Sequence, residues 1–169
     1  MRKIDIKTLC RVAILIALEI ILSRFLSFST MELKIGFGFV PIALCGFLYG
    51  PVITALAGAA ADFLGAMLFP IGAYFPGFTL TAALTGLCFG LFLHGRNVRF
   101  FPNIFFCALI NCLVLSLGLS TYWVSMITGN PFWIQTVTRL PQFGVSLALQ
   151  LALLPLIKKL SEVLKRGSI

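Results

Sequence analysis

The sequence contains few charged residues. Of its 169 residues only 18 are charged, and acidic side chains are the scarcest, with five Asp and Glu against thirteen Lys and Arg. Its mean hydropathy is +1.06. About a quarter of the residues in an ordinary soluble domain are charged, so this composition excludes that class. One apolar segment follows another with little polar sequence between them, which is typical of a polytopic helical membrane protein.

Catalytic and metal-binding signatures are also missing from the sequence. His94 is the only histidine, and there is no HExxH, GxSxG, paired intramembrane aspartate or Walker lysine loop. No two cysteines have CxxC spacing, and most lie inside apolar runs: Cys10, Cys45, Cys88, Cys107 and Cys112. We interpret them as small buried hydrophobic side chains rather than disulfides or metal ligands. The sequence therefore predicts neither an enzyme nor a bound cofactor or metal.

The net charge of +8 does not indicate a nucleic-acid partner, because the positive charges lie at the ends of apolar segments and not on a polar domain. Alternating segments of about ten residues, as in a transmembrane barrel, do not occur. The N-terminus is basic and then apolar, without a small-residue cleavage site, so we expect a retained first span. Residues 1–169 are predicted to form a single integral membrane domain.

Hydropathy and helix-breaking residues divide the chain into six apolar segments. Most have close to the 20 residues needed to cross a bilayer. The second is short and contains Pro41, so the sequence leaves open whether it spans fully or enters as a half-span. The segments are 8–28, 36–49, 51–69, 77–94, 103–126 and 139–157.

The distribution of basic residues predicts the orientation of the chain. Cytoplasmic loops of membrane proteins are enriched in Lys and Arg. If both termini are cytoplasmic, the cytoplasmic parts hold ten of the thirteen basic residues: Arg2, Lys3, Lys7, Arg11, Arg96, Arg99, Lys158, Lys159, Lys165 and Arg166. The opposite orientation would invert this bias. We therefore predict an all-α membrane protein, a bundle of six transmembrane helices with cytoplasmic N- and C-termini.

Three basic residues break this rule on the same side of the membrane. Arg24, Lys34 and Arg139 lie at the outer ends of spans or in outer loops. Each alone could be a snorkelling side chain, but together they indicate a pocket for an anion arriving from outside. Asp62 lies well inside the third span, where a carboxylate costs about 2.5–3.5 kcal/mol, so it should face a partner or a cavity. Glu19 in the first span could pair with a neighbouring helix.

Two outer loops are rich in aromatic residues. Residues 69–82, "FPIGAYFPGFTLTA", combine prolines, glycines and aromatics, and could form a lid over a planar ligand or an interfacial aromatic belt. The end of the fifth span, the start of the sixth and the loop between them supply Tyr122, Trp123, Trp133 and Arg139. Aromatic plates, one carboxylate and several cations suit a flat, hydrogen-bonding ring with an acidic tail.

At this point the sequence resembles a known family. Several stretches are similar to the substrate-binding S components of energy-coupling factor (ECF) vitamin transporters, and more narrowly to their folate-specific members. The resemblance covers essentially the whole chain. The stretches that carry it are "IALEIILSRFLSF", "GFGFVPIALCGFLYGP", "GAAADFLGAMLFPIGAYFPGFTLTAALTG" and "LSTYWVSM".

The resemblance implies a transport subunit of the bacterial plasma membrane and not an enzyme. S components bind a vitamin at the outer face and dock on an energising module, which consists of a transmembrane coupling protein and two cytoplasmic ATPases. They are thought to topple in the membrane lipid and so carry the vitamin inward. The AxxxA face of the first helix belongs to the docking surface, which points here to Ala13 and Ala17.

The chemistry of the candidate residues agrees with folate as the ligand. A carboxylate can hold the amidine-like edge of the pterin ring by paired hydrogen bonds, and we expect Asp62 in this role, with Glu19 as a substitute. The glutamate tail carries two negative charges. Arg24 is the first candidate to bind it, because arginine offers a planar fork to a carboxylate, and Arg139 or Lys34 is the second. The expected stacking residues or walls are Tyr74, Phe75, Phe78 and Trp123.

Other functions remain open at the level of sequence. The vitamin could be riboflavin, thiamine, biotin or pantothenate, although riboflavin has no dicarboxylate tail to match three outer cations. A small structural membrane protein without a ligand is the remaining alternative. In that case the outer cations would bind lipid head groups, and Asp62 would be paired within the bundle.

Overall fold

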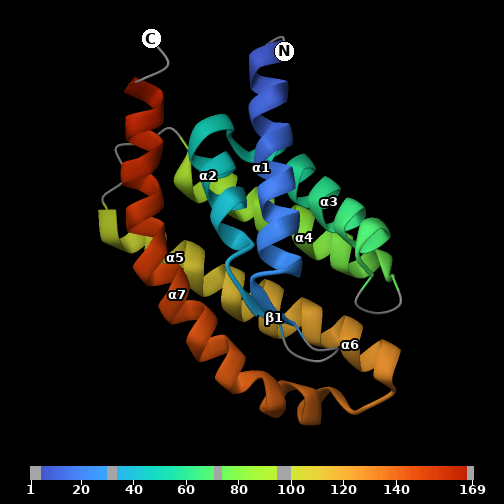
Figure 1. Ribbon diagram of the computed structural model, residues 1–169. Helices are drawn as coiled ribbons and strands as arrows, with labels where there is room; N and C mark the ends of the chain where they lie inside the picture. Colours follow the sequence, from blue (N-terminus) through green and yellow to red (C-terminus); the bar gives the residue numbers. More distant parts are fainter. Residues whose placement is uncertain (1–4, 30–33, 71–73, 95–99, 167–169) are drawn as a thin grey trace.

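The computed structural model describes residues 5–29, 34–70, 74–94 and 100–166, which form helices and one short β-hairpin (Figure 1). Helix α1, Ile6–Arg24, starts at one end of the molecule and leads to strands β1, Ser27–Ser29, and β2, Lys34–Gly36. The strands pair antiparallel, with Phe28 opposite Ile35. A Cβ on Gly36 would lie 2.2 Å from the Cβ of Ser27, so this pairing needs a glycine.

The hairpin corrects two predictions. The first helical segment was expected to reach residue 28, but the helix ends at Arg24 and Ser27 and Phe28 lie in β1. The fold is accordingly nearly all-helical rather than all-α. Strands of three residues are shorter than the four to eight residues over which an alternating pattern can be recognised.

The second segment is a short helix. Helix α2, Phe39–Tyr49, has 11 residues and rises about 16 Å, roughly half of the hydrocarbon thickness. Gly50, with φ of +86°, makes the tight turn into α3, Pro51–Leu68. The question that the sequence left open is thus answered, because α2 is too short to cross a bilayer by itself.

Helix α4, Pro76–Leu93, packs closely on α3 through glycines. A Cβ on Gly86 would lie 2.3 Å from the carbonyl oxygen of Thr54, and one on Gly90 would lie 2.2 Å from the Cα of Pro51. These glycines therefore serve packing within the chain. The predicted bounds of the third and fourth segments, 51–69 and 77–94, differ from the observed helices by one residue at each changed end.

The fifth segment is one long helical stretch with an irregular middle. It consists of α5, Phe100–Ile110, the π-helix η1, Asn111–Ser120, and α6, Thr121–Thr128. The sequence predicted helix over 103–126. A π-helix closes its hydrogen bonds one residue further along than an α-helix, and such stretches occur frequently at functional sites.

The last helix is much longer than expected. Helix α7, Phe132–Arg166, has 35 residues, whereas the sequence predicted 139–157. Its first turns include residues that were assigned to an outer loop. Figure 1 shows α7 curving around one side of the molecule. Pro141 and Pro155 lie inside it, and an interior proline removes one backbone hydrogen bond and bends a helix.

Four helical stretches of the described residues are long and apolar enough to cross a membrane: α3, α4, residues 102–128 and most of α7. Helix α1 has 19 residues but carries four charged side chains, and α2 is too short. The prediction of six spans is therefore supported in part. The first turn of α1 and the last turns of α7 lie at the same end of the molecule (Figure 1).

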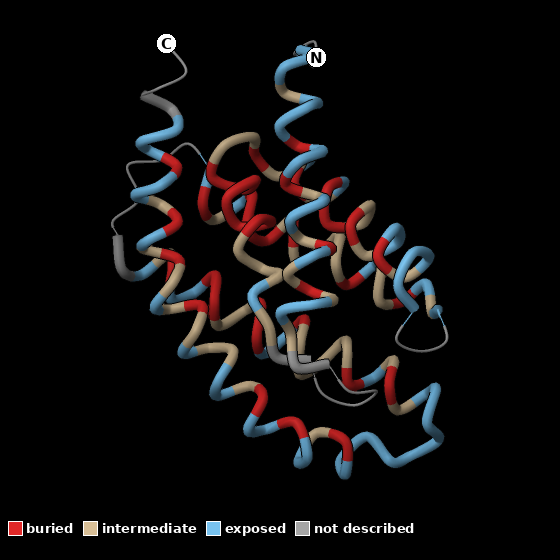
Figure 2. Tube along the Cα trace, in the orientation of Figure 1, coloured by how far each residue is buried: buried red, intermediate tan, exposed pale blue. Residues whose placement is uncertain are grey.

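The packing of the helices determines which side chains are buried. Figure 2 shows the buried residues gathered between the helices, with α2 in the middle of the bundle. Phe89 and Leu154 are fully buried, whereas large apolar side chains such as Leu56 and Leu156 are about two-thirds exposed. An apolar outer surface of this extent is what a lipid-facing surface requires.

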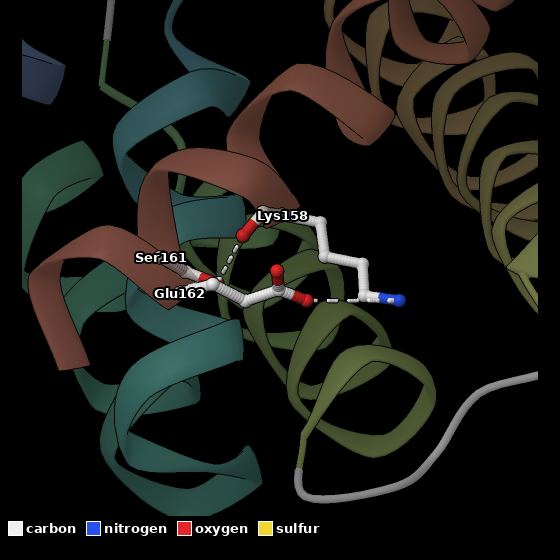
Figure 3. A network of polar contacts seen from close by, with 3 residues as sticks. All are labelled: Lys158, Ser161 and Glu162. Carbon is white, nitrogen blue, oxygen red and sulfur yellow. Dashed lines mark hydrogen bonds and ion pairs between the residues drawn. The ribbon is translucent and has the colours of Figure 1, made fainter. Parts of the chain in front are cut away.

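The last turns of α7 carry an ion pair between two charged side chains. On the last turns of α7, Lys158 Nζ lies 3.9 Å from Glu162 Oε1, and Ser161 Oγ donates to the carbonyl oxygen of Lys158 at 2.7 Å (Figure 3). Pairs four residues apart on an exposed helix contribute only a few tenths of a kcal/mol, about 0.3–0.5. This ion pair therefore contributes little to the stability of the helix.

Candidate ligand-binding cavity

A cavity of about 410 Å³ lies in the half of the molecule away from the first turn of α1 and the last turns of α7. Its walls come from the end of α1, the hairpin, the starts of α2 and α4, the second half of α3, η1 with α6, and the first half of α7. Small-molecule sites typically enclose about 300–1,000 Å³. The cavity is therefore of the right size for a ligand such as a vitamin.

Arg24 reaches this cavity from the last turn of α1. Its guanidinium rests on α3 at Gly65, where an added Cβ would lie 3.2 Å from Nε and 3.3 Å from Nη2. The Nε atom is buried without a hydrogen-bond partner, and no described residue forms an ion pair with this guanidinium. A buried charge without a partner is costly, so Arg24 favours an anionic ligand.

Arg139 lines the same cavity from the opposite side. It is 7% exposed, and its Nη1 donates to Thr121 Oγ1 at 3.5 Å. The sequence placed Arg139 at the outer end of a span, but it lies seven residues inside α7. The structure thus brings together two of the three cations that were predicted to bind an anion.

The carboxylate of Asp62 faces the cavity from α3. Thr79 Oγ1 donates to Asp62 Oδ2 at 2.9 Å, and Tyr74 Oη lies 3.1 Å from the same hydroxyl. Thr79 is in the first turn of α4, whose dipole also favours a nearby negative charge. Glu19, the predicted substitute for Asp62, lines the cavity as well. The site therefore offers acidic and basic groups from different helices.

Aromatic side chains form one wall. Tyr74, Phe75 and Phe78 line the cavity, and the rings of Phe75 and Phe78 meet edge to face with centroids 6.2 Å apart. Trp123 does not line the cavity. Its ring lies 5.4 Å from that of Phe75, and its Nε1 donates to Thr81 Oγ1 at 3.1 Å. Trp123 therefore supports this wall from behind.

Gly77 makes that support possible. A Cβ at this position would lie 2.6 Å from Trp123 Cδ2 and 2.6 Å from Phe75 Cε1, so any side chain here would separate the two rings. Pro76 precedes it at the first position of α4, where its fixed φ suits a helix start. The "FPGFTL" stretch thus sets both the start of α4 and the aromatic wall.

Lys34 and the alanine pair lie apart from these residues. The backbone of Lys34 belongs to β2, and its side chain lies outside the described part of the structure. Ala13 and Ala17 are exposed, one helical turn apart on α1, and do not line the cavity. Their position on the outer surface is compatible with a helix-packing face.

Sequence reasoning missed a second polar pair in the cavity. Asn111 of η1 and Gln150 of α7 both line it, are 5% and 6% exposed, and are joined by a hydrogen bond from Asn111 Nδ2 to Gln150 Oε1 at 3.3 Å. Each is a single amide within a long apolar run. Polar residues in such runs usually face the interior of a bundle, and this signal would have found them.

Comparison with known proteins decides the family. The sequence model of the ECF transporter, substrate-specific component, matches residues 7–158. The chain belongs to this family. S components of the family are membrane transport subunits, in agreement with the apolar helices described above.

Two relatives and one solved structure show which members of the family this S component is similar to. The chain is 39% identical over 140 residues to the folate transporter FolT of Clostridium novyi (strain NT), covering 83% of this chain and 80% of the relative. It is 32% identical over 124 residues to the folate transporter FolT of Leuconostoc mesenteroides, covering 73% and 66%. The crystal structure of FolT bound with folic acid superposes with a TM-score of 0.86 at 29% identity, covering 92% of this chain and 94% of the other.

Proposed function

We propose that this S component binds folate and serves as the substrate-binding subunit of an ECF-type importer. The observation that carries the proposal is the cavity, in which an arginine whose buried Nε has no hydrogen-bond partner, a second, buried arginine and a carboxylate meet an aromatic wall. The similarity to two folate transporters and to FolT bound with folic acid supports the same ligand.

The residues of the cavity suggest how folate is held. We assign the pterin edge to Asp62, whose carboxylate can accept paired hydrogen bonds, with Phe75 and Phe78 beside the ring. The glutamate tail is assigned to Arg24 and Arg139. A guanidinium and a carboxylate form a charge-assisted, often bidentate pair, about twice as strong as a neutral hydrogen bond. The tail then supplies the counter-charge that Arg24 lacks among the described residues.

Transport requires partners, because the chain has no nucleotide-binding motif. We infer that a transmembrane coupling protein and two ATPase subunits supply the energy. The exposed Ala13 and Ala17 are assigned to the contact with the coupling protein, since small residues four apart allow close helix packing. We assign the chain to a bacterial plasma membrane. The bias of basic residues supports cytoplasmic termini, and in that orientation we expect the cavity at the outer face.

A different vitamin is the second candidate that the same family allows. Riboflavin would use the aromatic wall but leave two arginines without an acidic tail. Biotin and pantothenate carry one carboxylate each and need less aromatic surface. A competition assay of folic acid against these vitamins separates the candidates, and displacement by one of them at equal concentration would redirect the assignment.

Calorimetric titration of the purified chain with folic acid tests the proposal. We expect tight binding that Arg24→Ala weakens by about 2–5 kcal/mol, because truncation leaves a buried charge of the ligand unpaired. The matched control is Arg11→Ala, which removes an exposed arginine from the other end of α1 and should leave affinity unchanged. A well-folded wild-type chain that binds no folic acid would overturn the assignment.

A further inference from the structure

Two opposite charges line one cavity without pairing. No ion pair joins Asp62 to Arg24, although both belong to the same wall, formed by α3 and the end of α1. Oppositely charged groups in a partly desolvated site attract each other strongly when they meet. The separation of these two groups therefore requires a structural cause.

Arg24 meets α3 within one helical turn of Asp62. The guanidinium of Arg24 lies against Gly65, three residues after Asp62 on the same helix. Side chains three apart on a helix are neighbours, with Cβ atoms about 5–6 Å from each other. Arg24 is therefore the cation that Asp62 would meet if its carboxylate turned along α3.

Thr79 is the group that holds Asp62 in its observed position. Its hydroxyl donates to Asp62 Oδ2 at 2.9 Å from the first turn of α4. Tyr74 Oη contacts the same hydroxyl at 3.1 Å, which fixes the rotor in one direction. A hydrogen bond to a carboxylate is stronger than a neutral one, so it can oppose the rotation.

We propose that Thr79 is a positioning residue that keeps Asp62 away from Arg24, so that both charges stay open to the ligand. Without the hydroxyl, Asp62 turns to Arg24 and the two neutralise each other inside the cavity. Ligand binding then has to break this internal pair first. The inference rests on the proposed function, in which Asp62 and Arg24 bind opposite ends of folate.

The test is a double-mutant cycle measured by calorimetry with folic acid. Thr79→Val removes the hydroxyl at nearly constant volume, and Asp62→Asn removes the charge that it positions. We expect Thr79→Val to weaken binding roughly tenfold or more, as the loss of a hydrogen bond to a charged group would. In the Asp62→Asn background the same substitution should have almost no effect, because Thr79 acts through Asp62.

Two further variants separate positioning from general structure. Thr79→Ser keeps the donor and should restore wild-type affinity. Thr136→Val removes a hydroxyl that bonds to its own helix at the carbonyl of Phe132, away from the cavity, and should leave affinity unchanged. If Thr79→Val fails to fold, Thr79→Ala carries the same expectation.

The outcomes distinguish this inference from the proposed function. Equal affinities of the wild type and Thr79→Val would overturn the inference and leave folate binding intact. Effects of Thr79→Val and Asp62→Asn that simply add would overturn it too, because Thr79 would then act independently of Asp62. A wild-type chain without folic acid binding would overturn both the inference and the proposed function.

Discussion

At the scale of single residues, the cavity depends on charges placed where water is scarce. Arg24 has a buried Nε without a hydrogen bond, and Arg139 is almost fully buried on the facing helix. Burial of this kind normally destabilises a protein unless a partner compensates it. At Arg24 an anionic ligand can remove this cost, which favours such a ligand over a neutral one.

Substitution of Gly65 gives the clearest prediction for a single residue, because the Arg24 guanidinium packs against this glycine. A methyl group in Gly65→Ala would lie 3.2 Å from Nε, so the guanidinium has to shift by a few tenths of an ångström. We expect folic acid affinity to fall by about 1 kcal/mol, roughly fivefold, as the fork loses alignment with the carboxylate. Calorimetry of the purified variant measures this.

Gly118→Ala is the matched control for this substitution. Its added Cβ would meet only the Leu113 carbonyl oxygen, at 3.5 Å, which is an ordinary contact. Affinity should therefore be unchanged. Equal losses in both variants would contradict the role of Gly65 and indicate a general effect of glycine replacement.

Much of the site could be predicted residue by residue. Arg24, Asp62 and Arg139 are charges in or beside apolar runs, and such charges face a partner or a cavity. Trp123 could not be placed, because the sequence does not say which ring of a cluster reaches the surface and which lies behind. Asn111 and Gln150 carried the same signal as Asp62 but without charge.

At the scale of elements, the sequence determined helices well and irregular pieces poorly. Proline and glycine marked the starts of α3 and α4 to within a residue. The π-helix η1 could not be predicted from the sequence, because its composition is that of any apolar helix. The cavity-lining residues of η1 lie on one face of the helix: Asn111, Cys112, Leu115, Ser116 and Ser120.

The contact between α3 and α4 leads to a prediction on stability. In Gly90→Ala the new methyl group would lie 2.2 Å from Pro51 Cα and 2.6 Å from Pro51 N, both backbone atoms that cannot move alone. Overpacking of this kind costs about 1–3 kcal/mol or more. We expect a clear fall in the midpoint of thermal unfolding, followed on the purified chain in detergent.

The comparison for this variant is Gly144→Ala on α7. Nothing lies within 4 Å of the position of its Cβ, and alanine is favoured over glycine inside a helix by about 1 kcal/mol. Its midpoint should stay the same or rise. A Gly90→Ala chain that unfolds at the wild-type temperature would show that the two helices can separate without cost.

At the scale of the whole molecule, we assign different tasks to two separate surfaces. The cavity lies toward the end away from the first turn of α1, whereas the exposed Ala13 and Ala17 lie on the outside of that helix. Binding of the ligand and docking on the energising module can therefore be disturbed separately. The small side chains of the docking face cannot be recognised as such from composition, since alanines also fill helix–helix contacts within a chain.

Ala13→Trp tests this separation. The bulky ring would prevent close approach of a partner helix, so we expect the variant to bind folic acid normally but to lose co-purification with the coupling protein and ATPases. Ala148→Trp, at an exposed alanine of α7, is the control and should retain both properties. Normal uptake by an Ala13→Trp chain would remove Ala13 from the docking surface.

The length of α7 has a consequence for how the molecule can move. Arg139 and Lys158 are 19 residues apart on this one helix, about 28 Å along its path, which nearly equals the 30 Å or so of a hydrocarbon core. A basic residue therefore lies close to each end of a membrane-spanning length of α7. Sliding it by one turn would bring a charge into hydrocarbon at about 2.5–3.5 kcal/mol. Independent sliding of α7 along the membrane normal is therefore disfavoured.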